Sequence, residues 1–180
     1  MKKVAVLLAN GFEEIEALAS VDILRRAEFV VDTVSMNDDL GVESARGVEI
    51  IADKGFTDME VYDMVVLPGG KGAWLNRDDQ RVIDLLIGYN QENKYIGAIC
   101  AAPMAMGRAG IISGRKVTSY PDDEVRSYLN QAYYLDQAVV VDGNIVTSQG
   151  PATSFEFAYT LVELLGGDAH SLRSEMLYKK

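Results

Sequence analysis

Short hydrophobic runs alternate along this chain with longer segments in which hydrophobic residues recur every three or four positions. Continuous apolar runs of about four to eight residues are typical of strands buried on both faces of a sheet, and the longer spacing is typical of helices with one buried side. The first pattern predicts strands over residues 3–9, 29–35, 61–67, 95–99 and 116–119. The second predicts helices over residues 13–27, 79–91, 101–109, 122–130 and 154–165, with a short surface helix from Asp168.

Turn and cap residues add detail to this pattern. Residues 139–147 are predicted to form a β-hairpin, because a central Asp-Gly dipeptide supplies the positive φ angles of a tight turn. Residues 41–52 are expected to form one or two extended segments. Asn10 is a candidate N-cap for the first helix, with Glu13 three residues later. The alternation predicts one α/β domain over residues 1–180, with a mainly parallel sheet and helices on both faces.

Charge and hydropathy restrict the possible partners. The chain has 180 residues and a formal net charge of −10, which argues against a nucleic-acid or anionic-membrane surface because both attract clusters of Lys and Arg. The apolar run after Lys2 and Lys3 ends at Asn10 and is followed by glutamates, so we expect a buried strand rather than a signal peptide. No run approaches the roughly 20 apolar residues that span a bilayer. We therefore expect a cytoplasmic protein.

Cys100 is the single cysteine and the first candidate for chemistry. One cysteine excludes an internal disulfide, and no Cys/His cluster indicates zinc, so neither a metal nor a cofactor is expected. Cys100 lies between a predicted strand and a helix, with Ala98 and Ala101 nearby, an arrangement similar to a nucleophile elbow without its G-x-S-x-G consensus. A helix N-terminus lowers the pKa of such a thiol. From its position alone, Cys100 is equally a small buried hydrophobic residue.

Glu16 is the second candidate. It falls on a partly apolar helical stripe with Ile23 and Ala27. A carboxyl group buried there has a raised pKa and holds a proton near neutral pH. Alternatively, Glu16 is a solvated carboxylate in the first turn, stabilised by the helix dipole, as we expect for Glu13 and Glu14.

Gly69 and Gly70 follow another predicted strand and form a third candidate. Ligands of open α/β sheets bind outside the carboxyl ends of the strands, and glycines let backbone N–H groups approach a bound oxyanion. A plain turn explains the two glycines equally well. The run is not a P-loop, because no Gly-Lys-Ser/Thr follows. His170, the only histidine, is expected on the surface of the tail rather than in catalysis.

Six segments in a specific order carry a resemblance to a known family. They include LANGFEEIE at residues 8–16 and AICAAP at residues 98–103, and the others are residues 21–27, 62–70, 116–118 and 147–158. Together they resemble the ThiJ/PfpI superfamily, and within it the branch of the parkinsonism-associated protein, over nearly the whole chain. The resemblance implies a flavodoxin-like three-layer sandwich, similar to class I glutamine amidotransferases, and a homodimer.

The resemblance also implies residue roles and activities. It places the reactive thiol at Cys100, its carboxyl partner at Glu16, and an oxyanion pocket at the backbones of Gly70 and Ala101. It implies a glyoxalase or deglycase that acts on small α-oxoaldehydes such as methylglyoxal without glutathione. The alternative is a redox-sensing or chaperone-like stress protein in which Cys100 is oxidised to a sulfinate. Amidase, peptidase or thiamine-biosynthesis roles are further alternatives.

Two positions depart from the family pattern. The branch usually has a histidine after the Lys-Val-Thr strand, where this chain has Tyr120. A phenol titrates near about 10 and is a poor general base at neutral pH, although it can donate a hydrogen bond to a carbonyl or simply pack in the pocket wall. The protease-like branch has a histidine directly after the cysteine, where this chain has Ala101, which disfavours a Cys-His protease. We expect Tyr120, Gly69 and Pro151 to line the substrate pocket.

Overall fold

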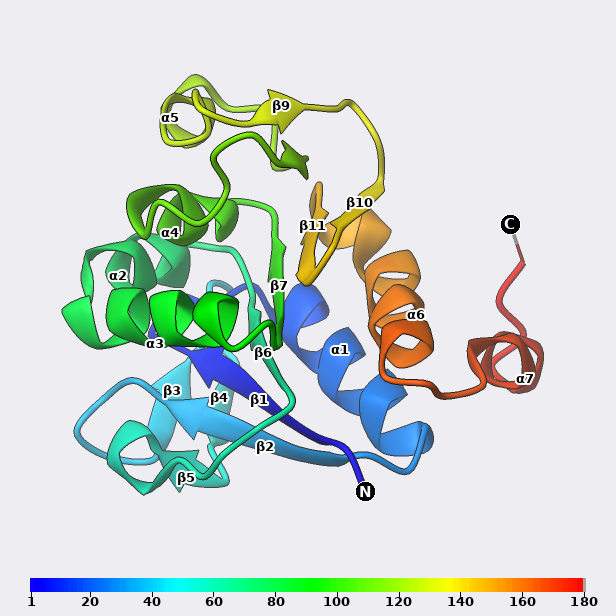
Figure 1. The fold of residues 1–180 in the computed structure, drawn as a ribbon. Coiled ribbons are helices and arrows are strands. Elements are labelled where there is room, and N and C mark those ends of the chain that lie inside the picture. Colours follow the sequence, from blue (N-terminus) through cyan, green and yellow to red (C-terminus); the bar gives the residue numbers. More distant parts are fainter. Residues whose placement is uncertain (180) are drawn as a thin grey trace.

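A seven-stranded sheet forms the centre of the protein in the computed structural model, which describes residues 1–179 (Figure 1). Its spatial order is β10-β11-β7-β6-β1-β2-β5. All neighbouring strands in it are parallel except β10 and β11, which form the predicted hairpin. The strands are β1 (Lys3–Leu8), β2 (Val30–Ser35), β5 (Lys54–Gly55), β6 (Met64–Leu67), β7 (Tyr95–Ile99), β10 (Val139–Asp142) and β11 (Ile145–Ser148).

Helices cover both faces of this sheet, as Figure 1 shows. One layer holds α1 (Glu14–Arg26) and α6 (Ser154–Leu164), with α7 (Ala169–Glu175) packed on α6. The opposite layer holds α2 (Gly72–Asp78), α3 (Gln80–Gln91) and α4 (Pro103–Arg108). This confirms the predicted flavodoxin-like sandwich with a mainly parallel sheet. Within residues 1–179, no helix has the length and apolar character needed to cross a membrane.

Two smaller sheets lie outside the central sheet. Residues 41–52 contain a separate two-stranded antiparallel sheet of β3 (Gly41–Glu43) and β4 (Glu49–Ile51). A second small sheet pairs β8 (Lys116–Val117) with β9 (Tyr133–Tyr134) on either side of α5 (Asp123–Ser127). Two 3₁₀ turns span Phe56–Asp58 and Pro151–Thr153.

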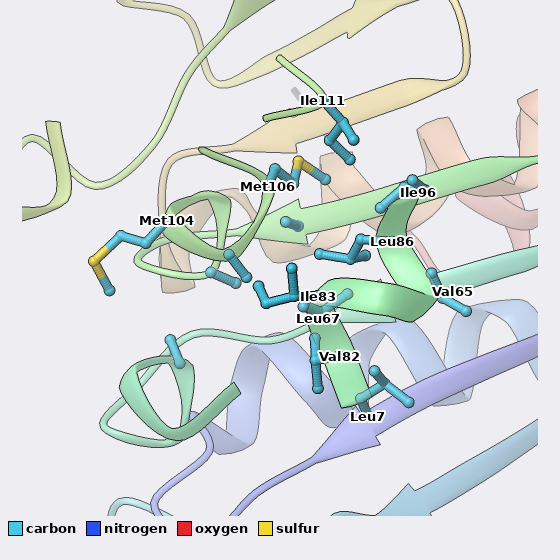
Figure 2. Packing of buried hydrophobic residues seen from close by; sticks show 14 of the residues in the cluster. Leu7, Val65, Leu67, Val82, Ile83, Leu86, Ile96, Met104, Met106 and Ile111 are labelled. Carbon is cyan, nitrogen blue, oxygen red and sulfur yellow. The ribbon is translucent and has the colours of Figure 1, made fainter. Parts of the chain in front are cut away.

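The hydrophobic core is divided by the sheet into two clusters. Strand residues point alternately to the two faces, so β1, whose residues from Val4 to Leu8 are fully buried, contributes to both clusters. Burying such a side chain contributes about 1.5–3 kcal/mol relative to leaving it exposed. Figure 2 shows side chains of α3 facing strand residues in one cluster; those labelled are Val82, Ile83 and Leu86 on the helix and Leu7, Val65, Leu67 and Ile96 on the strands.

Several predicted boundaries differ from the structure. The strand predicted over 116–119 pairs only through Val117, and the helix predicted over 122–130 ends at Ser127. The helix expected from residue 101 begins at Pro103, because residues 100–102 form a turn. Elements α2, β5 and β9 were not predicted. Their sequences are short and lack a sustained hydrophobic period.

The predicted cap of α1 was wrong. Glu13, not Asn10, is the N-cap, and its Oε2 atom accepts a hydrogen bond from the backbone N–H of Glu16 at 2.9 Å. Asn10 Oδ1 instead accepts hydrogen bonds from the Asn37 side chain and the Glu43 backbone, both at 3.0 Å. Asn10 therefore connects the end of β1 to β3, and the helix begins later than the sequence suggested.

Candidate active site

The candidate residues meet where the strand order reverses. Strand β1 has β2 on one side and β6 on the other, and the chain leaves the carboxyl ends of β1, β6 and β7 at the same edge of the sheet. Open α/β folds bind ligands at such a point. Glu16 follows β1, Gly69 and Gly70 follow β6, and Cys100 follows β7.

Cys100 has a left-handed backbone conformation, with a φ of 64°. Such a conformation is rare for a residue with a side chain and costs about 1–2 kcal/mol. Two hydrogen bonds hold it, because the Cys100 N–H donates to Ser148 O and the Cys100 carbonyl accepts from Tyr120 N–H, each at 2.9 Å. The side chain is free of disulfide bonds and partly exposed, and it contacts both core clusters. Cys100 therefore lies at a strained strand-to-helix turn, the position that the sequence predicted for it.

Glu16 is fully buried in the first turn of α1, so the buried and not the solvated alternative holds. Its Oε2 atom accepts a hydrogen bond from Gly69 N–H at 2.7 Å, whereas Oε1 is buried without a hydrogen-bond partner in the protein. Burial raises the pKa of the Glu16 carboxyl to about 7, against the opposing effect of the Gly69 N–H. A carboxyl group with a pKa in this range is suited to act as a general acid or base at neutral pH.

The expectation that Glu13 and Glu14 are simply solvated was wrong, since both are half-buried and hydrogen-bonded. Glu13 caps α1 through Glu16 N–H, and Glu14 Oε1 accepts a hydrogen bond from Ser44 Oγ at 2.8 Å. The Glu-x-x-Glu spacing at the start of the helix was the available signal for the first of these contacts.

The expected lowering of the Cys100 pKa is contradicted. Burial and the charge of the Glu16 carboxylate raise the pKa of the Cys100 thiol, while the backbone N–H groups of Gly70 and Ala101 act in the opposite direction. Helix α4 begins three residues after Cys100 and has only six residues, so its dipole is a weak compensation. Because two adjacent buried anions repel each other, ionisation of the carboxyl group opposes ionisation of the thiol, and the two groups titrate as a coupled pair.

Gly69 and Gly70 allow the three strand ends to approach one another. A Cβ atom on Gly69 would lie 2.6 Å from Glu16 Oε2 and 3.0 Å from Cys100 Sγ, so both reactive groups touch the same backbone position. Gly70 has a φ of 75°, and a Cβ there would collide with the carbonyl oxygen of Gly11. A plain turn would not require glycine at both positions. The backbone N–H groups of Gly70 and Ala101 act on the Cys100 thiol and lower its pKa, against the effect of burial.

Tyr120 and Pro151 lie together, but Gly69 does not join them. Both line a shallow pocket of about 270 Å³ with Gly150 and neighbouring residues. Tyr120 is 49% exposed and is linked to the site through its backbone bond to Cys100. His170 is exposed on α7, as expected. Within residues 1–179, no group of three or more His, Cys, Asp and Glu side chains is arranged to hold a metal ion.

Comparison with known proteins gives a consistent assignment. Residues 2–164 match the DJ-1/PfpI family. The chain is 38% identical over 169 residues to protein dj-1beta of Drosophila melanogaster, covering 92% of this chain and 90% of that protein. It is 34% identical over 178 residues to glutathione-independent glyoxalase DJ-1 of Schizosaccharomyces pombe, covering 91% of each. The crystal structure of Drosophila melanogaster DJ-1beta has a TM-score of 0.94 at 35% identity over 99% of both chains. The chain belongs to the DJ-1/PfpI family.

Proposed function

We propose that this protein is a glutathione-independent glyoxalase that converts small α-oxoaldehydes such as methylglyoxal to 2-hydroxy acids. The observation that carries the proposal is the pairing of Cys100 with the buried Glu16, opposite the backbone N–H groups of Gly70 and Ala101. The Schizosaccharomyces pombe relative, which bears the name glutathione-independent glyoxalase DJ-1, supports the same activity.

The first step is the addition of the thiol to the aldehyde. The Cys100 sulfur bonds to the aldehyde carbon as the Glu16 carboxylate accepts the thiol proton, which compensates for the raised pKa of the thiol. The electron pair of the C=O bond moves to oxygen, and the N–H groups of Gly70 and Ala101 stabilise that charge. Glu16 then passes the thiol proton to this oxygen, which gives a hemithioacetal and restores the Glu16 carboxylate.

The second step moves a proton between two carbon atoms. Glu16 removes the proton from the former aldehyde carbon, giving an enediol, and returns a proton to the adjacent carbon. Oε1 of Glu16 has no partner in the protein and is the oxygen available for this transfer. The product is a thioester of the 2-hydroxy acid. Water hydrolyses the thioester, releases lactate when the substrate is methylglyoxal, and regenerates the Cys100 thiol.

Tyr120 supports this chemistry as a hydrogen-bond donor rather than as a base. Its side chain stands at the rim of the shallow pocket that also contains Pro151. A phenolic O–H can donate a hydrogen bond, so Tyr120 is suited to orient the second carbonyl of the substrate. The proton transfers then fall to Glu16 alone.

The test is lactate production from methylglyoxal in the absence of glutathione. We expect turnover by the wild type and its loss by a factor of about 100 or more in Cys100→Ser and Glu16→Gln, the usual scale for removing a nucleophile or a general base. Glu14→Gln removes a carboxylate from the same helical turn and serves as the control with activity near wild type. Equal activity in all four proteins would contradict the mechanism.

The alternative functions also use the Cys100 sulfur, but fewer structural features support them. A Cys-His amidase or peptidase requires an imidazole near the thiol, whereas Ala101 follows Cys100 and the only histidine is exposed on α7. Oxidation of Cys100 to a sulfinate would use the same Glu16 and backbone donors. No contact favours it over the glyoxalase reaction.

We also propose a homodimer formed through α1 and the β3–β4 sheet. Exposed apolar side chains gather on these elements, namely Ile15, Leu18, Val48 and Ile51. The two elements adjoin, because Phe12 O accepts a hydrogen bond from Ala45 N–H at 2.7 Å. Burial of such a patch favours association. In sedimentation experiments we expect Leu18→Glu and Ile51→Glu to be monomers. Val141→Glu changes an exposed apolar position on β10, outside this patch, and we expect this control to remain a dimer.

We place the protein in the cytoplasm, where reducing conditions keep a lone cysteine as a thiol. A partly exposed free Cys100 suits such a compartment. Fractionation of cells that produce the tagged protein tests the placement, and recovery in an oxidising compartment would contradict it.

A further inference from the structure

Glu13, Glu16 and Gly69 form a closed ring of three hydrogen bonds. The Glu16 N–H donates to Glu13 Oε2 at 2.9 Å, and the Glu13 N–H donates to the Gly69 carbonyl at 3.0 Å. The Gly69 N–H donates to Glu16 Oε2 at 2.7 Å and completes the ring. Each of the three residues donates one hydrogen bond and accepts one, so none can shift alone.

We propose that Glu13 is a positioning residue, whose carboxylate holds the first turn of α1 so that the Glu16 carboxyl stays against Gly69 and the Cys100 sulfur. The inference deepens the proposed function, on which its catalytic readout rests. The hydrogen bonds of Glu13 in this ring go to the Glu16 N–H and the Gly69 carbonyl. Its effect passes through the Glu16 backbone.

The position of Glu16 depends on the cap because Glu16 lies in the first helical turn. The first N–H groups of a helix have no partner within it, and a side chain that accepts a hydrogen bond from one of them stabilises the turn by about 0.5–2 kcal/mol. Glu13 is the only residue with a side chain that caps α1 within the described structure. The space around Gly69 is tightly filled, because a Cβ atom at this position would lie within 3.0 Å of both Glu16 Oε2 and Cys100 Sγ. A small displacement of the turn therefore changes the separation of carboxyl and sulfur.

Glu13 also acts through its charge. The groups that act on Glu16 are the Cys100 thiol, the Gly69 N–H and the Glu13 carboxylate, and this carboxylate raises the Glu16 pKa. Glu14 is held by Ser44. On α6, which packs against α1, Glu156 and Glu163 both pair with Arg173. Loss of the Glu13 charge is therefore expected to ease ionisation of the Glu16–Cys100 pair.

Three variants separate the cap from the charge. Glu13→Ala removes both, Glu13→Gln keeps an acceptor oxygen without charge, and Glu13→Asp keeps the charge on a shorter side chain that is also a good cap. Glu14→Gln is the matched control, because it removes one charge from the same turn without touching the ring. The first readout is the rate of Cys100 alkylation by iodoacetamide against pH, which requires no turnover. The second is the kcat and KM of lactate formation from methylglyoxal.

We expect Glu13→Ala to lose about tenfold in kcat, with KM changed by less than about twofold, since Glu16 acts in proton transfer rather than in substrate binding. Glu13→Asp and Glu13→Gln are expected to restore kcat to within about threefold of wild type. The midpoint of alkylation should move to lower pH in Glu13→Gln and stay unchanged in Glu14→Gln.

The inference is overturned if Glu13→Ala keeps the wild-type kcat and alkylation profile, or if Glu13→Asp is as impaired as Glu13→Ala. If Glu13→Ala does not fold, Glu13→Asp still decides, because a tenfold loss of kcat in this variant, which keeps both the cap and the charge, would overturn the inference. Failure of the proposed function is a distinct result. In that case the wild type forms no lactate, while the alkylation profiles remain measurable.

Discussion

Two glutamates of this protein have opposite electrostatic settings. Glu16 is buried beside Cys100, and burial raises the pKa of its carboxyl to about 7. Glu60 is exposed between Lys3 and Lys54, each at 2.6 Å, and these hydrogen bonds lower the pKa of its carboxyl to about 2. Loss of hydration sets the pKa of Glu16, and pairing with two lysines sets the pKa of Glu60.

The two carboxyl groups also differ in what their surroundings contribute to stability. Glu60 has two ideal partners, yet exposed ion pairs contribute little to stability because water solvates the separated charges almost as well. Glu16 has one N–H donor and an unpartnered oxygen, a costly arrangement for a buried carboxyl group. Groups with such perturbed pKa values cluster at functional sites, which is consistent with the role proposed for Glu16.

The largest expected effect is a dependence of stability on pH that comes from Glu16. Its pKa is about 7 in the folded protein and 4.5 ordinarily, so the folded state retains a proton that the unfolded chain releases. This stabilisation is complete below pH 4.5 and is lost as pH rises through 7, with a magnitude on the order of 3 kcal/mol. Urea unfolding from pH 4.5 to 8 measures it. In Glu16→Gln the free energy of unfolding should depend less steeply on pH. An unchanged pH dependence would show that another group is responsible for it.

The next effect tests the crowding around the buried carboxyl. In Gly69→Ala the new Cβ would lie 2.6 Å from both Glu16 Oε2 and Cys100 Cβ. Overpacking of this kind costs about 1–3 kcal/mol, and we expect slower alkylation of Cys100. Gly88→Ala is the control, because a Cβ there meets open space within α3 and should stabilise the protein by about 0.5–1 kcal/mol. Equal effects of the two substitutions on unfolding would contradict the close approach at Gly69.

A smaller effect concerns the backbone of Cys100. Because its φ is 64°, Cys100→Gly removes the strain that Cys100→Ala retains. We expect the glycine variant to be more stable by about 1 kcal/mol. Thermal unfolding of the two variants, neither of which has a reactive sulfur, makes the comparison. A more stable alanine variant would mean that Cβ packing outweighs the strained turn.

The smallest effect belongs to Glu60. We expect Glu60→Gln to leave Cys100 alkylation unchanged and to alter the unfolding midpoint at pH 7 barely at all. Because its folded pKa lies below the ordinary 4.5, its contribution is present above pH 4.5 and is lost as pH falls through about 2. A difference from wild type should therefore vanish in acid, and it should shrink in high salt. A large, salt-independent loss of stability at pH 7 would contradict the contrast with Glu16.

Sequence reasoning placed the candidate residues more accurately than it described their electrostatic environment. Continuous apolar runs predicted the buried parallel strands, and the strand ends then predicted the edge where Glu16, Gly69 and Cys100 meet. The family resemblance, rather than the helical pattern, paired Glu16 with Cys100. The direction of the thiol pKa was wrong, because local sequence shows a nearby helix start but not the buried carboxylate that follows another strand.

Local capping was harder to predict for a similar reason. Asn10 is the better cap by residue type, yet the chain between β1 and α1 must first reach Gly70, with which Phe12 forms an isolated bridge. That long-range contact delays the helix until Glu13. Short elements such as β5 and β9 depend on pairing with distant strands, and no period of two can develop over two residues.

The requirement for glycine at position 69 also limits how this protein can acquire a new activity. Because Glu16 and Cys100 both touch that position, a substitution that adjusts one of them disturbs the other, and stepwise improvement of the pair is blocked. The rim around Tyr120 and Pro151 is exposed and bears no such constraint. Laboratory evolution toward larger or more polar aldehydes should therefore accumulate changes at the rim and leave the centre untouched.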